Sequence, residues 1–144
     1  MILLDTNILL RHASAADPLY AIADAAISVL KGRRQKLTIV PQNLYEFWSA
    51  ATRPANVNGL GFSVAECITA VGRIKKLFHL KPDQPTLFAE WESLVMTYQC
   101  QGKTAHDARL VAAMRTHGLS SILTFNFVDF QRYPGLTIID PAAL

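Results

Sequence analysis

An apolar run leads directly into an aspartate in the stretch Met1-Ile-Leu-Leu-Asp5-Thr-Asn-Ile-Leu-Leu10. A short apolar run bounded by polar, turn-forming residues is typical of a buried strand in a parallel sheet. Asp5 would then lie at the carboxyl end of this strand, where open α/β sheets bind their ligands. A carboxylate that loses its water there needs a partner, and a divalent cation is an obvious one. We therefore expect a ligand-binding aspartate at one edge of a parallel sheet.

The rest of the chain alternates short apolar runs with helical patterns. Three further strands are predicted at residues 37–40, 121–124 and 136–139. Helices are predicted at residues 18–30, 41–53, 63–78, 86–99 and 104–118, separated by glycines, prolines and asparagines. Strands that alternate with helices indicate an α/β fold with a central parallel sheet and helices on both faces. No repeat or linker-like stretch interrupts the 144 residues, so we expect one domain over residues 1–144.

Composition excludes several other classes of protein. Hydrophobic residues make up 51% of the chain, which is too many for a disordered segment. No apolar run is long enough to span a bilayer, and the first residues lack the features of a signal peptide, so no membrane partner is expected. Cys67 and Cys100 stand alone within helical patterns, as free thiols do in a reducing compartment. These features together predict a cytoplasmic protein.

The charge distribution has two readings. The net charge is +3, and four of the eleven acidic residues are candidates for one site. Setting those four aside leaves fourteen basic residues against seven acidic ones. A pocket of carboxylates in a basic body suits a metal site that meets a phosphate backbone. An ordinary solvated surface explains the same numbers equally well.

The four candidate acids are expected to meet at one edge of the sheet. Asp5 ends the first strand, Asp107 lies in the first turn of the helix that leads to the third strand, and Asp129 follows that strand. Glu46 lies about one and a half turns into the helix after the second strand, so its side chain can reach the same edge. Carboxylate oxygens from different elements are the ligands that Mg²⁺ prefers. Asp5, Glu46 and Asp107 are the predicted metal ligands, and Asp129 is the fourth predicted catalytic acid.

Each acid also has a purely structural interpretation. Asp107 could form a capping box with Thr104, and Asp129 could cap a turn. Glu46 could belong to a solvated helix face, and Asp5 could cap the turn that follows it. Trp48 and Trp91 are expected in the core rather than in a binding surface. Histidine and cysteine spacing does not fit zinc, and the glycine motifs of hydrolases, phosphate-binding loops and dinucleotide sites are absent.

Four segments in order carry a resemblance to a known family. They are Leu3-Leu-Asp5-Thr-Asn-Ile-Leu, Pro41-Gln-Asn-Leu-Tyr-Glu46-Phe-Trp, His106-Asp107-Ala-Arg-Leu-Val-Ala-Ala and Ile122-Leu-Thr-Phe-Asn126-Phe-Val-Asp129-Phe. Together they resemble the PIN-domain ribonucleases, and specifically the VapC-type toxins of bacterial toxin–antitoxin pairs. The resemblance implies a compact three-layer α/β/α sandwich and an endoribonuclease that depends on Mg²⁺ or Mn²⁺. It also implies the toxin of a type II system, a homodimer, and a cognate antitoxin that blocks the site.

The resemblance assigns roles to particular residues of this chain. The acidic quartet of the family carries over to Asp5, Glu46 and Asp107, whereas the fourth position of the family pattern holds Asn126. Asp129 is the nearest acid to that position. Thr6 matches the hydroxyl that supports the first aspartate of the family.

Basic residues supply candidate contacts to the RNA backbone. These are Arg11, Arg53, Arg109 and the cluster Lys31–Lys36, although cations at a helix end also interact favourably with the helix dipole. The departure at Asn126 favours a competing interpretation, a catalytically silent PIN-like module that binds RNA or protein.

Overall fold

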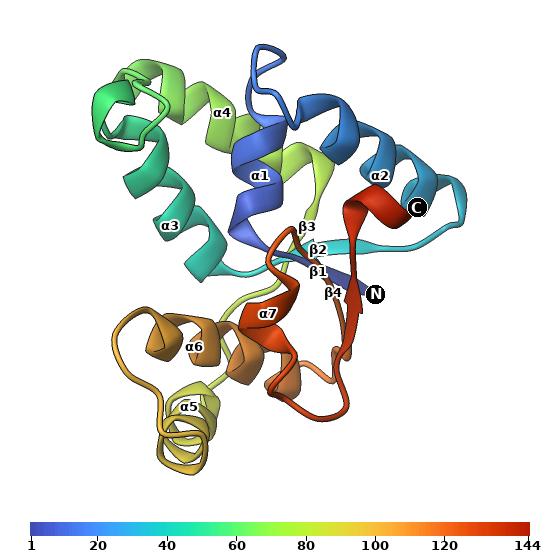
Figure 1. The fold of residues 1–144 in the computed structure, drawn as a ribbon, viewed down its shortest axis with the longest axis vertical. Coiled ribbons are helices and arrows are strands. Elements are labelled where there is room, and N and C mark those ends of the chain that lie inside the picture. The colour runs from blue at the N-terminus through green and yellow to red at the C-terminus, as the bar shows by residue number, and fades with distance from the viewer.

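A computed structural model describes residues 1–144 and contains one five-stranded sheet in which all neighbouring strands are parallel. The strand order is β3-β2-β1-β4-β5 (Figure 1). The bounds are β1 Ile2–Leu4, β2 Leu37–Ile39, β3 His79–Leu80, β4 Ser121–Leu123 and β5 Thr137–Ile139. The first strand of the chain therefore lies in the middle of the sheet. Its carboxyl end is flanked on both sides by the ends of β2 and β4.

Helices cover both faces of the sheet. One layer contains α1 Thr6–His12, α2 Tyr20–Gly32, α3 Pro41–Thr52 and α4 Val64–Leu77, above the sheet in Figure 1. The other layer, below the sheet, contains α5 Leu87–Thr97 and α6 Lys103–Thr116, with the short α7 Phe127–Phe130 beside α6. Two 3-10 turns complete the chain, η1 Ala55–Val57 and η2 Pro141–Ala143. The expected α/β class and three-layer α/β/α sandwich are confirmed.

Alternation along the strands explains the three layers. Ile2 and Leu4 pack into one buried cluster with residues of α1 to α4, whereas Leu3 between them packs into a second cluster with residues of α5 and α6. Successive side chains of a strand point to opposite faces, so an all-apolar strand requires a helical layer on each side. Burial of each large apolar side chain contributes about 1.5–3 kcal/mol relative to exposure. The central strands are thus held firmly from both faces.

The structure adds three α-helices or strands that were not predicted. α1 Thr6–His12 begins directly after Asp5, where only a turn was expected. β3 has only two residues, both exposed, and is separated from the end of α4 by one residue, so no apolar run marks it. α7 is a single turn of helix at residues 127–130, where a loop was expected. Residues 124 and 40 were predicted as strand but lie just beyond β4 and β2. The predicted helices agree with the observed ones to within a few residues.

The predictions made for the cysteines and the tryptophans are confirmed only in part. Both cysteines are free, with Cys67 buried and Cys100 partly buried, as expected. The prediction of a core position is wrong for Trp48, whose side chain lies on α3 and is 37% exposed. Trp91 is partly buried against the α5–α6 core cluster. None of the helices combines the length and the apolar character that crossing a membrane requires.

Candidate active site

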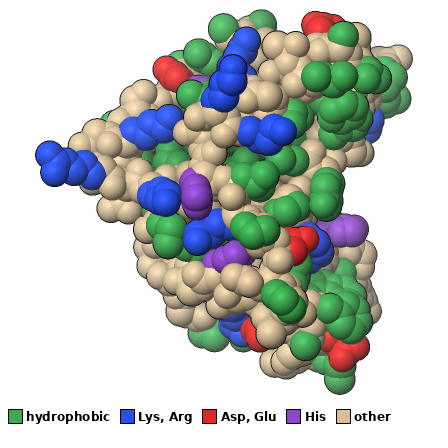
Figure 2. All heavy atoms as spheres, turned by 180° about the vertical axis from the view of Figure 1, so that it is seen from behind, with side chains coloured by type: hydrophobic (Ala, Val, Ile, Leu, Met, Phe, Trp, Pro, Cys, Tyr) green, Lys and Arg blue, Asp and Glu red, His purple; other side chains and the backbone are tan.

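A cleft of about 500 Å³ opens at the carboxyl edge of the sheet, between α3 and α6. In the space-filling view the outline of the molecule is notched on the side where these helices face each other, at the right of Figure 2. All four candidate acids line this carboxylate cleft, together with Thr6, Asn7, Arg53, Lys103, His106 and Asn126. The structure therefore brings together the acidic residues that the sequence separates by up to 124 positions.

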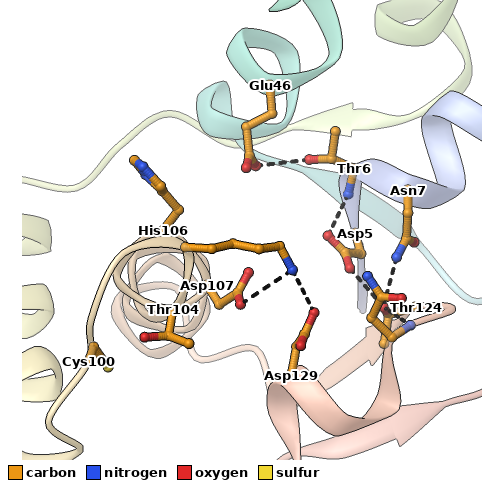
Figure 3. A network of polar contacts seen from close by, with 12 residues as sticks. Asp5, Thr6, Asn7, Glu46, Cys100, Thr104, His106, Asp107, Thr124 and Asp129 are labelled. Carbon is orange, nitrogen blue, oxygen red and sulfur yellow. Dashed lines mark hydrogen bonds and ion pairs between the residues drawn. The ribbon is translucent and has the colours of Figure 1, made fainter. Parts of the chain in front are cut away.

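Asp5 is fixed by both of its oxygens. It ends β1 and caps α1, where its Oδ1 accepts a hydrogen bond of 2.7 Å from the backbone N–H of Thr6. The Thr124 hydroxyl, just beyond β4, donates to Oδ2 at 2.7 Å (Figure 3). Burial nevertheless raises the pKa of Asp5 to about 6, because loss of water outweighs the two hydrogen bonds that favour the charged form. A bound cation would stabilise the ionised form of such a carboxylate.

Glu46 points toward Asp5 from α3 because the first turn of that helix is anchored to β1. Asn43 accepts a hydrogen bond from the Val40 N–H at 2.9 Å and donates to the carbonyl of Leu4 at 3.0 Å. The Thr6 hydroxyl donates to Oε1 of Glu46 at 3.0 Å. Thr6 was expected to support the first aspartate through its hydroxyl, but that hydroxyl supports Glu46 instead. The alternative interpretation, in which Glu46 belongs to a solvated helix face, is therefore not supported.

Asp107 faces the other acids from α6 (Figure 3). It lies in the second turn of the helix, because α6 begins at Lys103. The predicted first-turn position and the capping box with Thr104 are therefore wrong, since the Thr104 hydroxyl bonds to the N–H and carbonyl of Gln101 at 2.8 Å. Oδ2 of Asp107 is buried and has no hydrogen-bond partner. Burial raises the pKa of Asp107 to about 6.

Asp129 lies in α7 and makes an ion pair with Lys103. Nζ of Lys103 is 2.9 Å from Oδ2 of Asp129 and 3.9 Å from Oδ2 of Asp107, too far for a hydrogen bond to the latter. The hydrogen bond to Asp129 raises the pKa of Lys103. No side-chain cap is present at the start of α7, so the interpretation of Asp129 as a turn cap finds no support. Asn126 also lines the cleft, and its backbone N–H donates to the Thr124 hydroxyl at 2.9 Å.

The side chains of the cleft fit a hard divalent cation in their chemistry. They offer carboxylate oxygens, and one of these oxygens is buried without a partner. As they stand, no three acidic, histidine or cysteine side chains are close enough together to enclose an ion. Mg²⁺ keeps several of its waters and needs only one or two carboxylates in direct contact. Two direct ligands and water-mediated contacts to the others would meet that requirement.

The basic residues proposed for RNA binding are placed differently from one another. Arg53 lines the carboxylate cleft, whereas Arg11 lies outside it and pairs with Asp17 at 3.2 Å. Arg109 also lies outside the cleft, and its guanidinium contacts Asp83 and Gln42. The cluster Lys31–Lys36 precedes β2 and therefore lies at the amino edge of the sheet, opposite the acids.

The polar residues of the site that were missed in the sequence include Lys103 and Thr124. Lys103 sits one turn before Asp107, an i, i+4 spacing that brings opposite charges together on a helix. Thr124 directly follows β4 beside β1, so its register with Asp5 follows once the two strands are known to be neighbours. The spacing of Lys103 could have been recognised in the sequence, whereas the pairing of β1 with β4 is a long-range contact that carries no local signal.

Solved structures with this fold are numerous, although no family model and no curated protein sequence matches the chain. The chain has the three-layer PIN-like fold of toxin–antitoxin structures. A toxin–antitoxin complex from Klebsiella pneumoniae is 20% identical with a TM-score of 0.65, covering 98% of both chains. VapBC2 from Rickettsia felis, bound to a promoter DNA fragment, is 13% identical with a TM-score of 0.70, covering 96% of this chain and 98% of the other. The sarcin–ricin loop cleaving toxin VapC20 of Mycobacterium tuberculosis is 19% identical with a TM-score of 0.61, covering 85% and 87%.

Proposed function

We propose that this chain is an endoribonuclease that depends on Mg²⁺ or Mn²⁺ and cleaves RNA phosphodiester bonds. The observation that carries this proposal is the convergence of Asp5, Glu46, Asp107 and Asp129 in one cleft of a PIN-like fold. Two of these carboxyls, Asp5 and Asp107, are raised in pKa by burial and therefore gain from a bound cation. A bound cation would also reduce the repulsion between these carboxylates and a phosphodiester, in addition to the positive charges of Lys103 and Arg53 at the cleft.

The residues of the cleft divide the chemical work. Asp5 and Asp107 would hold the cation directly, with Glu46 beside them and Asp129 acting through water or through its charge. A bound Mg²⁺ or Mn²⁺ polarises a phosphoryl oxygen and lowers the pKa of a bound water. Thr124 and Thr6 keep two of the carboxylates in place through their hydroxyls. Arg53, at the wall of the cleft, would attract the phosphate backbone.

Cleavage assays with purified protein test this function. Unstructured RNA is incubated with the protein in Mg²⁺, in Mn²⁺ and in EDTA, and the products are separated on a gel. We expect cleavage only with a metal, and its loss in Asp5→Asn and in Asp107→Asn with circular dichroism unchanged. Asp24→Asn is the matched control, because Asp24 lies outside the cleft and pairs with His12. Cleavage that persists in EDTA or in both cleft variants would contradict the proposal.

A second candidate function is a silent PIN-like module that binds RNA or protein. Two observations favour it: Asn126 replaces an acid, and the ammonium of Lys103 already neutralises Asp129 and approaches Asp107. Such a module would bind RNA with and without metal and release no products. The same assay separates the two candidates, since only the nuclease produces metal-dependent fragments.

The biological role we propose is that of the toxin in a type II toxin–antitoxin pair. It rests on the fold shared with toxin–antitoxin structures, one of which is named as a sarcin–ricin loop cleaving toxin. The proposal includes a homodimer and a cognate antitoxin that covers the cleft. Induction of this chain in bacteria should slow growth, induction of Asp5→Asn should not, and a co-expressed antitoxin should restore growth. Normal growth with abundant, RNA-cleaving protein would contradict the toxin role and leave the nuclease assignment standing.

A further inference from the structure

A second hollow lies next to the carboxylate cleft, between α5 and α6. We call it the aromatic pocket; its volume is about 390 Å³ and its lining residues are Leu87, Phe88, Trp91, Ala105, His106 and Arg109. His106 lines both hollows and directly precedes Asp107. In Figure 3 the imidazole of His106 projects outward from α6 and points away from the carboxylate of Asp107. The two hollows therefore share one wall, formed by the start of α6.

The aromatic pocket is a preformed surface rather than a loose patch. The indole N–H of Trp91 donates to the carbonyl of Ala105 at 2.8 Å, which ties α5 to α6 and fixes the orientation of the ring. Phe88 lies 5.8 Å from Trp91 between ring centroids, with the rings tilted by 41°. The Phe88 side chain is 65% exposed, so its ring is available to a ligand. A fixed aromatic pair with one open face is a platform for a flat, apolar group.

The polar edge of the aromatic pocket is equally well held. Arg109 donates to Oε1 of Gln42 at 3.0 Å and to Oδ2 of Asp83 at 3.1 Å. The carbonyl of His106 accepts from the amide of Gln42 at 2.8 Å, which locks this part of α6 against α3. The pocket thus combines a flat apolar wall with an imidazole and a guanidinium at its rim. These are the groups that stack on nucleobases, bond to their edges and attract phosphate.

We propose that the aromatic pocket binds one unpaired nucleobase of RNA, next to the phosphate that enters the carboxylate cleft. This inference rests on the proposed ribonuclease function and assigns its substrate a second point of contact. The shared wall at His106 puts a base in the pocket and a phosphate in the cleft within one continuous surface. The pocket volume is at the lower end of small-ligand sites, about 300–1,000 Å³, and suits a single nucleotide. A base must be unstacked to enter, so the substrate would be single-stranded at this position.

Tryptophan fluorescence tests this assignment without any cleavage. The chain has two tryptophans, so Trp48→Phe leaves Trp91 as the only reporter. In an Asp5→Asn, Trp48→Phe protein kept in EDTA, we expect single-stranded RNA homopolymers to quench Trp91 saturably for at least one base. Inorganic polyphosphate, which has charge but no bases, should not quench. Absence of quenching by every homopolymer, or equal quenching by polyphosphate, would overturn the proposal and leave the pocket to an apolar side chain of a protein partner.

Substitution of Phe88 provides the second test, measured as the affinity for a labelled RNA oligomer. Phe88→Ala should weaken binding about tenfold, within the range measured for loss of one base–aromatic stack, and Phe88→Tyr should retain it. Met96→Ala is the matched control, since Met96 is on the same helix, is 67% exposed and does not line the pocket. Equal affinities of Phe88→Ala and Met96→Ala would overturn the subsite. RNA cleavage by the wild type in that case would leave the ribonuclease function intact, so the two failures can be told apart.

Discussion

The hydroxyl of Thr124 donates a 2.7 Å hydrogen bond to Oδ2 of Asp5 and so joins the ends of two neighbouring strands. The same oxygen of Thr124 accepts from the backbone N–H of Asn126 at 2.9 Å and from the amide of Asn7 at 3.3 Å. One buried hydroxyl thereby orients the central carboxylate of the cleft and the turn that carries Asn126. A carboxylate oriented by other side chains holds its position when a ligand approaches.

Removal of this hydroxyl should weaken the site while the fold persists. Thr124→Val keeps the shape of the side chain but leaves Oδ2 of Asp5 without its donor, so the pKa of Asp5 should rise further. We expect metal-dependent RNA cleavage to fall about 10–100-fold, as is typical when a supporting contact to a metal ligand is lost. The free energy of unfolding should drop by about 1–3 kcal/mol, the cost of leaving a buried group unsatisfied. Thr124→Ser keeps the hydroxyl donor and should keep its activity. A loss of activity as large as that of Thr124→Val would show that packing, and not the hydrogen bond, is responsible.

Lys103 acts as an internal counter-ion, and its removal should favour binding of the metal. Lys103→Met removes the ammonium that is bonded to Asp129 and lies 3.9 Å from Asp107. Because the Lys103 side chain is largely exposed, the effect should be modest. We expect a gain in affinity for Mn²⁺ of at most about fivefold, since a surface ion pair contributes about 0.2–1 kcal/mol. Isothermal titration of the metal without RNA measures it. Lys103→Arg keeps the charge and should bind Mn²⁺ like the wild type; a weaker affinity in Lys103→Met would show that the amine assists binding.

Asp129 should assist the metal without contacting it directly. Its carboxylate lies on the short helix α7 and is held by Lys103, whose ammonium is 2.9 Å from Asp129 and 3.9 Å from Asp107. Asp129→Asn removes one negative charge from the cleft, so activation by Mg²⁺ should need about 10–100-fold more metal and be restored at high concentration. A titration of cleavage rate against Mg²⁺ gives the midpoint. A midpoint equal to that of the wild type would exclude Asp129 from the site, and a loss that excess metal cannot restore would indicate a direct ligand.

The order of layers could be predicted because β1 and β4 carry apolar side chains on both faces. Such strands have to be buried under two helical layers, so residues like Leu3 and Leu4 define the sandwich in the sequence itself. β3 could not be predicted, because both of its residues are exposed and it depends on pairing with β2. α7 could not be predicted either, since a four-residue helix has almost no periodicity.

The positions of the acids followed from the topology, but their contacts did not. Asp5 and Asp107 were expected at one edge of the sheet, and both line the cleft there. Whether a hydroxyl serves Asp5 or Glu46 depends on the direction of single side chains, and here Thr6 serves Glu46 while Thr124 serves Asp5. Such choices are made by tertiary packing, for which the spacing of residues along the chain gives no information.

The metal-free protein should lose stability as the pH rises, because Asp5 and Asp107 both have a pKa of about 6 in the folded chain. The ordinary value is 3.8, so between pH 4 and 6 the unfolded chain releases protons that the folded chain retains. The free energy of unfolding therefore falls through this interval and levels off above it. Since one unit of pKa corresponds to about 1.4 kcal/mol, the complete fall due to Asp5 is roughly 3 kcal/mol. Asp5→Asn should remove it, so the stability of the variant relative to wild type should increase from pH 4 to pH 7 in urea titrations with EDTA. Added Mg²⁺ should stabilise the wild type more at pH 7 than at pH 5, because only the ionised carboxylates bind it. If the stability curves of the wild type and Asp5→Asn in EDTA ran parallel from pH 4 to pH 7, Asp5 would ionise at its ordinary pKa.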